Sequence, residues 1–114
     1  MTKHKMTNEI IIARLDGKLF AAARSIEEGG AMRAVQLLYE ETKKAANSTL
    51  PPLEIGVADE GEIEELEANW SAAITDKMSF KSEWLLGFEP TGEDDEGNIL
   101  YEVWVGGPVR SKFH

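Results

Sequence analysis

Residues 9–24 read EIIIARLDGKLFAAAR, and the fold of the whole chain depends on them. Asp16-Gly17 is a dipeptide typical of a two-residue β-turn, and it separates two largely apolar segments. The first segment holds three consecutive isoleucines, Ile10 to Ile12, and β-branched residues favour strands. The pattern therefore predicts a β-hairpin that is apolar on both faces, so that its strands are covered on both sides or lie centrally in a sheet.

The same residues also fit an amphipathic helix. Five apolar residues recur at spacings of three and four: Ile12, Leu15, Leu19, Ala23 and Ile26. Three consecutive alanines are also poor strand residues. A helix here would hold Gly17 in its interior, at a cost of about 1 kcal/mol relative to alanine. We prefer the hairpin and keep the helix as the alternative.

A helix is expected next, over residues 31–46. Ser25 and Glu28 match a capping box, in which two side chains satisfy the free N–H groups of the first turn. The apolar stripe comprises Ala31, Val35, Leu38, Thr42 and Ala45, with Met32 and Tyr39 beside it. Pro51 and Pro52 follow the helix and cannot continue it.

A short strand and a second helix are predicted after the prolines. Leu53, Ile55 and Val57 alternate with other residues, as in a strand with two different faces. Asp59 or Glu60 then begins a helix. Its apolar residues share one face: Ile63, Leu66, Trp70 and Ile74.

The C-terminal third is expected to be a second hairpin. Residues 90–97 form its loop, and alternating residues line one side of each strand. These residues are Phe80, Ser82, Trp84, Leu86 and Phe88 on the first strand, and Ile99, Tyr101, Val103 and Val105 on the second. Trp84 and Trp104 are assigned to the core, although an exposed tryptophan would suit an interface.

Together these elements predict an α+β fold in the order ββαβαββ. An antiparallel sheet of about five strands would carry two helices packed on it. If residues 9–24 were helical, the order would become ααβαββ with a smaller sheet. Residues 1–114 are expected to form a single domain, with residues 1–8 and 109–114 as flexible tails.

Negative charge is concentrated in one part of the chain. Residues 45–109 contain fifteen acidic side chains and two basic ones, within a net charge of −9. One cluster occupies the first two turns of the second helix: Glu60, Glu62, Glu64, Glu65 and Glu67. The other lies in the hairpin loop: Glu93, Asp94, Asp95 and Glu96. No lysine or arginine follows four residues after any of the helix glutamates, so their repulsion has no local compensation.

Several kinds of chemistry are disfavoured by the residues present. The chain has no cysteine, and its histidines, His4 and His114, lie near the termini, so we expect no catalytic triad and no His- or Cys-based metal site. Aligning Gly97 with the sixth position of an EF-hand loop places Gly92 where the first carboxylate ligand belongs. We therefore expect no metal site, no cofactor and no enzymatic activity.

The charge and composition also bear on partners and location. A chain this acidic would mostly repel phosphates, so direct binding to nucleic acid is not expected. The absence of cysteine fits a reducing cytoplasm, and no apolar run is long enough for a signal peptide or a membrane span. We therefore expect a cytoplasmic protein with no membrane partner.

The sequence is most consistent with a non-catalytic acidic binding or inhibitor protein. Its carboxylates would mimic phosphates and occupy a basic site on a partner that handles nucleic acid, such as a nuclease or a DNA-binding complex. Small acidic immunity proteins and phage-encoded anti-defence inhibitors act in this way as a class, an analogy of charge and size alone. The alternative is a small structural, assembly or homo-oligomerising protein whose acidity serves only solubility.

Overall fold

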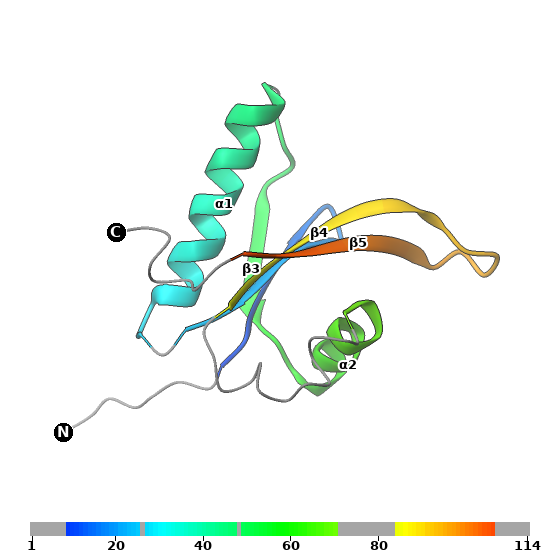
Figure 1. The fold of residues 1–114 in the computed structure, drawn as a ribbon, viewed down its shortest axis with the longest axis horizontal. Coiled ribbons are helices and arrows are strands. Elements are labelled where there is room, and N and C mark those ends of the chain that lie inside the picture. The colour runs from blue at the N-terminus through cyan, green and yellow to red at the C-terminus, as the bar shows by residue number, and fades with distance from the viewer. Residues whose placement is uncertain (1–8, 26, 48, 71–83, 107–114) are drawn as a thin grey trace.

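The computed structural model describes residues 9–25, 27–47, 49–70 and 84–106, in which two helices pack on one five-stranded sheet (Figure 1). The elements are β1 (Ile11–Leu15), β2 (Lys18–Arg24), α1 (Gly30–Ala46), β3 (Leu53–Val57), α2 (Glu60–Asn69), β4 (Trp84–Glu93) and β5 (Ile99–Gly106). The sheet is antiparallel, in the strand order β3-β1-β2-β4-β5. The predicted α+β fold and its order ββαβαββ are confirmed, and the helical alternative for residues 9–24 is wrong.

The turn between β1 and β2 explains why the hairpin forms. Asp16 and Gly17 have φ angles of 55° and 81°, and a two-residue turn with both central residues at positive φ matches the twist of the adjoining strands. Leu15 and Lys18 pair across the turn. The Asp-Gly signal therefore outweighs the helical spacing of the apolar residues.

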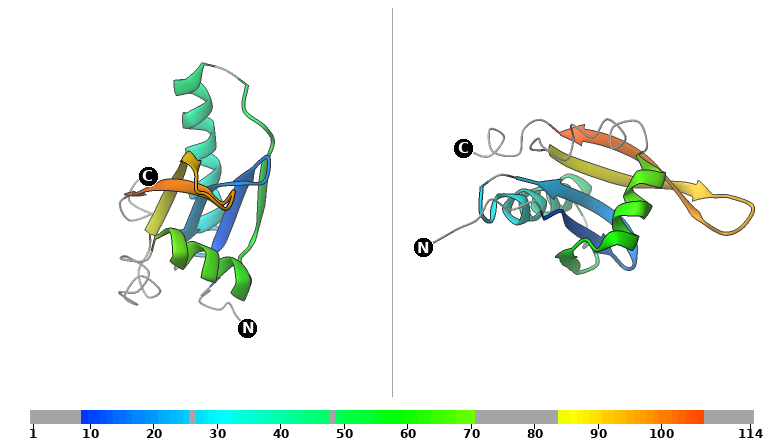
Figure 2. Two further views of the ribbon diagram at one scale, coloured as in Figure 1. Left: turned by 90° about the vertical axis from the view of Figure 1, so that its right-hand side faces the viewer. Right: turned by 90° about the horizontal axis from the view of Figure 1, so that it is seen from below.

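The β1–β2 hairpin is buried on both faces because α1 and α2 lie on opposite sides of the sheet (Figure 2). On the α1 side, Ala13, Ala21 and Ala23 are fully buried among α1 residues. On the α2 side, Ile12 and Leu19 are buried with residues of α2 and β4. Small side chains let a helix approach the sheet closely, so tertiary packing overrides the weak strand propensity of alanine.

A β-bulge changes which face one aromatic residue occupies. Ala13 pairs with Ala21, but Arg14 pairs with Leu19, which leaves Phe20 as the extra residue on β2. Phe20 joins the core beneath α1 and meets the Tyr39 ring edge to face, with 6.1 Å between the ring centroids. The bulge thus places Phe20 and Ala21 in the same core cluster.

Helix α1 covers the predicted residues 31–46 and begins one residue earlier, but its cap and part of its buried face differ from the prediction. Gly29 is the N-cap in a left-handed conformation, and no side chain caps the helix. The predicted Ser25–Glu28 capping box is wrong, because the Ser25 hydroxyl is buried and accepts a hydrogen bond from the Glu27 backbone N–H at 3.0 Å. The core contacts of α1 come from Ala31, Ala34, Val35, Leu38 and Tyr39, whereas Met32 and Ala45 are exposed.

A capping box does form at the start of α2. The Asp59 side chain accepts from the Glu62 N–H at 2.8 Å, and the Glu62 side chain accepts from the Asp59 N–H at 3.0 Å. The predicted start of this helix is therefore confirmed. The helix ends at Asn69 with Trp70 as its C-cap, and Ile74, assigned to the same apolar face, lies outside the described residues.

The β4–β5 hairpin projects beyond the rest of the sheet (Figure 1). β2 pairs with β4 only from Trp84 to Gly87, whereas β5 pairs with it as far as Glu93. The predicted loop over residues 90–97 is therefore too long. Pro90 lies beyond the part of β4 that pairs with β2 and next to a register shift between Pro90 and Gly92, and sheets tolerate proline at such edge and bulge positions.

Some predicted features fall outside the described part of the chain. They are the two tails, residues 1–8 and 109–114, and the first two alternating residues of the C-terminal hairpin, Phe80 and Ser82. On the first strand the rest of the alternation is confirmed, because Trp84, Leu86 and Phe88 are buried together on the α2 side. On the second strand, Tyr101 and Val103 pack against the same cluster.

Leu66 is the buried residue that joins α2 to the sheet, with no exposed surface. We expect Leu66→Ala to lower the free energy of unfolding by about 2–5 kcal/mol, because it removes apolar contact and leaves a cavity. Urea unfolding followed by circular dichroism measures the loss. The control is Met32→Ala on α1, where the side chain is 40% exposed and the expected change is below about 1 kcal/mol. Equal losses in both variants would contradict this packing.

Candidate functional site

The five α2 glutamates divide between two flanks of the helix. Ile63, Leu66 and Trp70 face the sheet, and the Trp70 ring lies 5.6 Å from that of Trp84 between centroids. Helical spacing places Glu62 and Glu65 on one side of this apolar face. The same spacing places the other three on the opposite flank and the outer surface: Glu60, Glu64 and Glu67. The cluster read from the sequence is therefore two groups with different surroundings.

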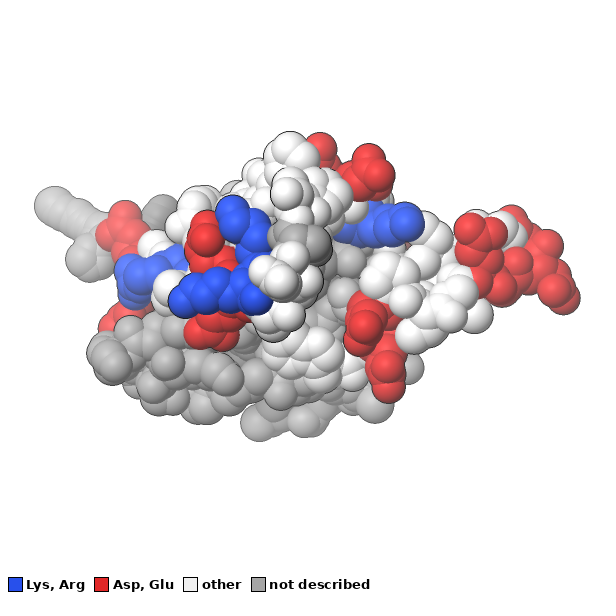
Figure 3. Space-filling model, turned by 90° about the horizontal axis from the view of Figure 1, so that it is seen from above, with Lys and Arg blue, Asp and Glu red and all other residues white. Residues whose placement is uncertain are grey.

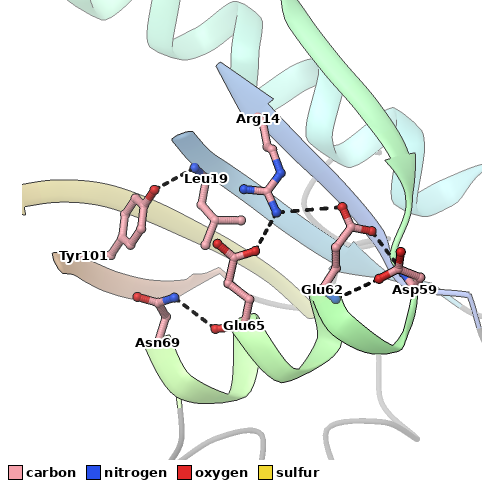
Figure 4. Close-up of polar contacts among 7 residues, drawn as sticks. All are labelled: Arg14, Leu19, Asp59, Glu62, Glu65, Asn69 and Tyr101. Atoms are coloured by element: carbon pink, nitrogen blue, oxygen red, sulfur yellow. Dashed lines mark hydrogen bonds and ion pairs between the residues drawn. The ribbon is translucent and has the colours of Figure 1, made fainter. Parts of the chain in front are cut away.

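Arg14 of β1 engages the first group (Figure 4). Its Nη2 atom donates to Glu65 Oε1 at 2.6 Å and lies 3.7 Å from Glu62 Oε2. The hydrogen bond to Glu65 is the largest cause of a raised Arg14 pKa, opposed by partial burial of the guanidinium. The repulsion among the helix glutamates, which has no local compensation in the sequence, is thus partly offset by a residue of a distant strand.

The second group on α2 keeps its charge unpaired within the described chain. Glu60 and Glu64 are exposed and Glu67 is half-buried. The ion pairs among the described residues join Arg14, Arg33 and Lys43 to other carboxylates, and none reaches these three. Among the described residues, the outer flank of α2 is therefore a strip of three carboxylates that the ion pairs do not reach.

One residue of the hairpin cluster has a structural role. Asp94 Oδ1 accepts from the backbone N–H groups of Glu96 and Asn98, each at 2.9 Å, and Oδ2 accepts from the Asn98 side chain at 3.3 Å. These bonds, led by the Asn98 backbone N–H, lower the pKa of Asp94. Asp94 thus organises the turn, whereas Glu93, Asp95 and Glu96 are exposed around it.

A groove lies between α2 and the base of the turn that joins β4 to β5. It has a volume of about 530 Å³. Its lining residues are Gly17, Glu65, Ala68, Asn69, Gly97, Asn98, Ile99 and Tyr101. The Tyr101 hydroxyl is held in place by the Leu19 backbone N–H, which donates to it at 2.9 Å (Figure 4). Of the nine predicted site residues, Glu65 alone lines the groove. The four hairpin acids, Glu93 to Glu96, directly precede the lining residues Gly97 and Asn98 in the chain but do not line the groove themselves.

The structure also exposes surface residues that the sequence pattern did not single out. Trp84 is buried as predicted, but Trp104 is 42% exposed, so its assignment to the core is wrong. Glu89 lies directly opposite Glu102 on β4 and β5, and both are exposed. Strand alternation could have placed Glu102 and Trp104 on one face, but the register across the hairpin required the structure.

Two further features bear on the chemistry of the described residues. No group of three or more carboxylates or histidines converges there in a way that could hold a metal ion. Neither α1 nor α2 is long and apolar enough to cross a membrane. His4 and His114 lie outside the described part of the chain.

Comparison with protein-family models, with curated proteins and with solved structures finds no match to this chain.

The contact between Arg14 and Glu65 is measurable by a double-mutant cycle. We expect Arg14→Met and Glu65→Gln to show a coupling free energy of about 0.5–1 kcal/mol in low salt, because both groups are partly exposed to water. Urea unfolding of the four proteins gives this value, and 1 M salt should reduce it. The matched cycle of Arg14→Met with Glu64→Gln should show no coupling. Equal coupling in both cycles would contradict a specific contact.

The turn of the β4–β5 hairpin should become less stable in acid. The pKa of Asp94 is lower in the folded turn than its ordinary value of 3.8, so the stabilisation is fully present above that value and is lost as the pH falls through the lowered folded pKa. NMR titration should show the amide signals of Glu96 and Asn98 shifting together with the Asp94 carboxyl signal. In the Asp94→Ala variant this shared transition should disappear. Its persistence would assign the transition to another group.

Proposed function

We propose that this protein is a non-catalytic binding protein that docks on a basic, nucleic-acid-handling partner protein, such as a nuclease or a DNA-binding complex. Its carboxylates take the places of phosphates in the basic site of that partner. The observation that carries the proposal is the segregation of charge between the parts of the fold.

The two helices differ sharply in their charge pattern. Residues 27–47, which include α1, mix four acidic side chains with three basic ones, and two ion pairs join them: Arg33–Glu27 and Lys43–Glu40. By contrast, α2 carries five glutamates and no basic residue. Mixed charge is sufficient to keep a small protein soluble, so a single-sign surface favours a role in binding.

The β4–β5 hairpin has the same single sign. Residues 84–106 contain six carboxylates and no basic residue. In Figure 3, acidic side chains gather at the far end of the hairpin, whereas both signs lie close together over the body of the molecule. Residues 89–98 are all exposed, so the hairpin presents its charge away from the core. Such a field raises the association rate with a basic protein.

The spacing of charge on α2 is close to that of a nucleic acid strand. Its ten residues span about 15 Å, so five glutamates give about one charge per 3 Å of axis. The outer flank alone, with Glu60, Glu64 and Glu67 over about 10 Å, carries about one charge per 5 Å. A single DNA strand carries one charge per about 3.4 Å of axis. A site built to bind phosphates would therefore meet a comparable charge density.

The proposal is tested by reversing charge on the outer flank of α2. The protein is immobilised and the basic protein that it captures from cell extract is identified. We expect Glu60→Lys, Glu64→Lys and Glu67→Lys together to weaken that complex by more than about tenfold, since each reversal replaces an attraction by a repulsion. Competing duplex DNA and raised salt should each release the partner from the unmodified protein.

A matched control separates this surface from net charge. Glu28→Lys, Glu40→Lys and Glu41→Lys change the net charge by the same amount at exposed positions in and just before α1. The control should bind the partner within about threefold of the unmodified protein, and circular dichroism should show both variants folded. Equal weakening by both triple variants, no competition by DNA, or salt-insensitive self-association without a basic partner would contradict the proposal. The last outcome would favour the assembly alternative.

A further inference from the structure

One face of the β4–β5 hairpin lacks the cover that α1 gives to the central strands. Leu85 of β4 belongs to the core cluster beneath α1, but Leu100 and Trp104 of β5 are 46% and 42% exposed. In the strand register Trp104 lies opposite Gly87, two residues along β4 from Leu85, so Trp104 points to the same side of the sheet as Leu85. An aromatic and an aliphatic side chain are therefore open to solvent on the α1 side of an edge strand.

The Trp104 ring lies directly over Gly87. A Cβ atom added to this glycine would come within 2.0 Å of Cε2 and Cζ2 of the indole. The ring therefore packs against the bare backbone of β4, and glycine is needed for this close approach. One part of the indole is used to cover the glycine, and the remainder forms a fixed aromatic surface.

Two carboxylates lie beside this ring. Glu102 precedes Trp104 by two residues on the same face of β5, and Glu89 lies directly opposite Glu102 on β4. Like charges directly opposite one another destabilise a sheet. Both side chains are exposed, and the ion pairs of the described chain do not include either of them. The pair is thus an unfavourable arrangement that a bound cation would relieve.

We propose that this face, formed by Gly87, Glu89, Leu100, Glu102 and Trp104, binds an arginine side chain within a basic segment of the partner protein. A guanidinium group stacks on an aromatic ring and donates to carboxylates in the same plane, a combination that the lysine ammonium cannot match. Leu100 contacts the apolar stem of the next basic residue in that segment. The inference rests on the proposed function, because it names the chemistry of the partner segment.

The test uses two fluorescent octapeptides, one alternating glycine with arginine and the other glycine with lysine, and the full-length protein. At 150 mM salt we expect the arginine peptide to bind about threefold more tightly than the lysine peptide, as measured by fluorescence anisotropy. Trp104→Leu keeps an apolar cover over Gly87 but removes the ring, and it should abolish this preference. Trp104→Tyr should retain it. An unchanged preference in Trp104→Leu would overturn the inference.

The acidic pair gives a second and independent readout. Glu89→Gln removes the like-charge repulsion, so it should raise the thermal midpoint by about 1–3 °C. It should also weaken binding of the arginine peptide by about twofold to threefold. A purely structural role would not couple greater stability to weaker binding. Binding that is unchanged in Glu89→Gln would therefore overturn the inference.

The variant with Glu60, Glu64 and Glu67 reversed to lysine separates this inference from the proposed function. These residues lie on the other side of the sheet, and screening at 150 mM salt limits their effect on the hairpin face. The α2 variant should keep the preference for arginine over lysine. If it keeps that preference but also captures the cellular partner normally, the proposed function fails while the arginine site stands. If it loses the preference, the arginine site as defined here is overturned.

Discussion

Burial of the β1–β2 hairpin on both faces is the constraint on which the rest of the structure depends. Two strands that are apolar on both sides require a layer on each side, and α1 and α2 provide these layers. The small side chains of Ala13, Ala21 and Ala23 set how closely α1 approaches, while Ile12 and Leu19 contribute to the core beneath α2. The same demand for cover fixes α2 and its glutamates on the face opposite the mixed-charge helix.

The position of α2 separates glutamates that the sequence presents as one cluster. Burial of Leu66 directs the apolar face of the helix to the sheet, so the glutamates must occupy its flanks. On one flank Arg14 pairs with Glu65 and Glu62, which lowers the repulsion where helix and sheet meet. The other flank carries the three glutamates that we propose dock on a basic partner. The proposed binding surface and the contacts that stabilise the fold thus involve different members of the same acidic segment.

The β4–β5 hairpin shows a similar division of roles along a two-stranded ribbon. Where β2 pairs with β4, the residues facing α2 are buried, Trp84 and Leu86 among them. Beyond Gly87 none of the other described strands pairs with the ribbon, and its acidic side chains face solvent. The exposed indole of Trp104 lies opposite Gly87 itself. The Asp94 carboxylate accepts hydrogen bonds from the backbone N–H groups of Glu96 and Asn98, which fixes the backbone of the turn.

Local patterns in the sequence were sufficient to determine the α+β fold, the order of its elements and the start of α2, because turns, caps and periodicity depend on residues a few positions apart. The Ser25–Glu28 cap, the start of the predicted hairpin loop and the burial of Trp104 were wrong, since each depends on what packs beside the segment. Only the tertiary structure decided that Arg14 meets Glu65, 51 residues away, and that Glu89 faces Glu102. Strand register and helix placement bring distant residues together, and the energy of such contacts has no signature in local spacing.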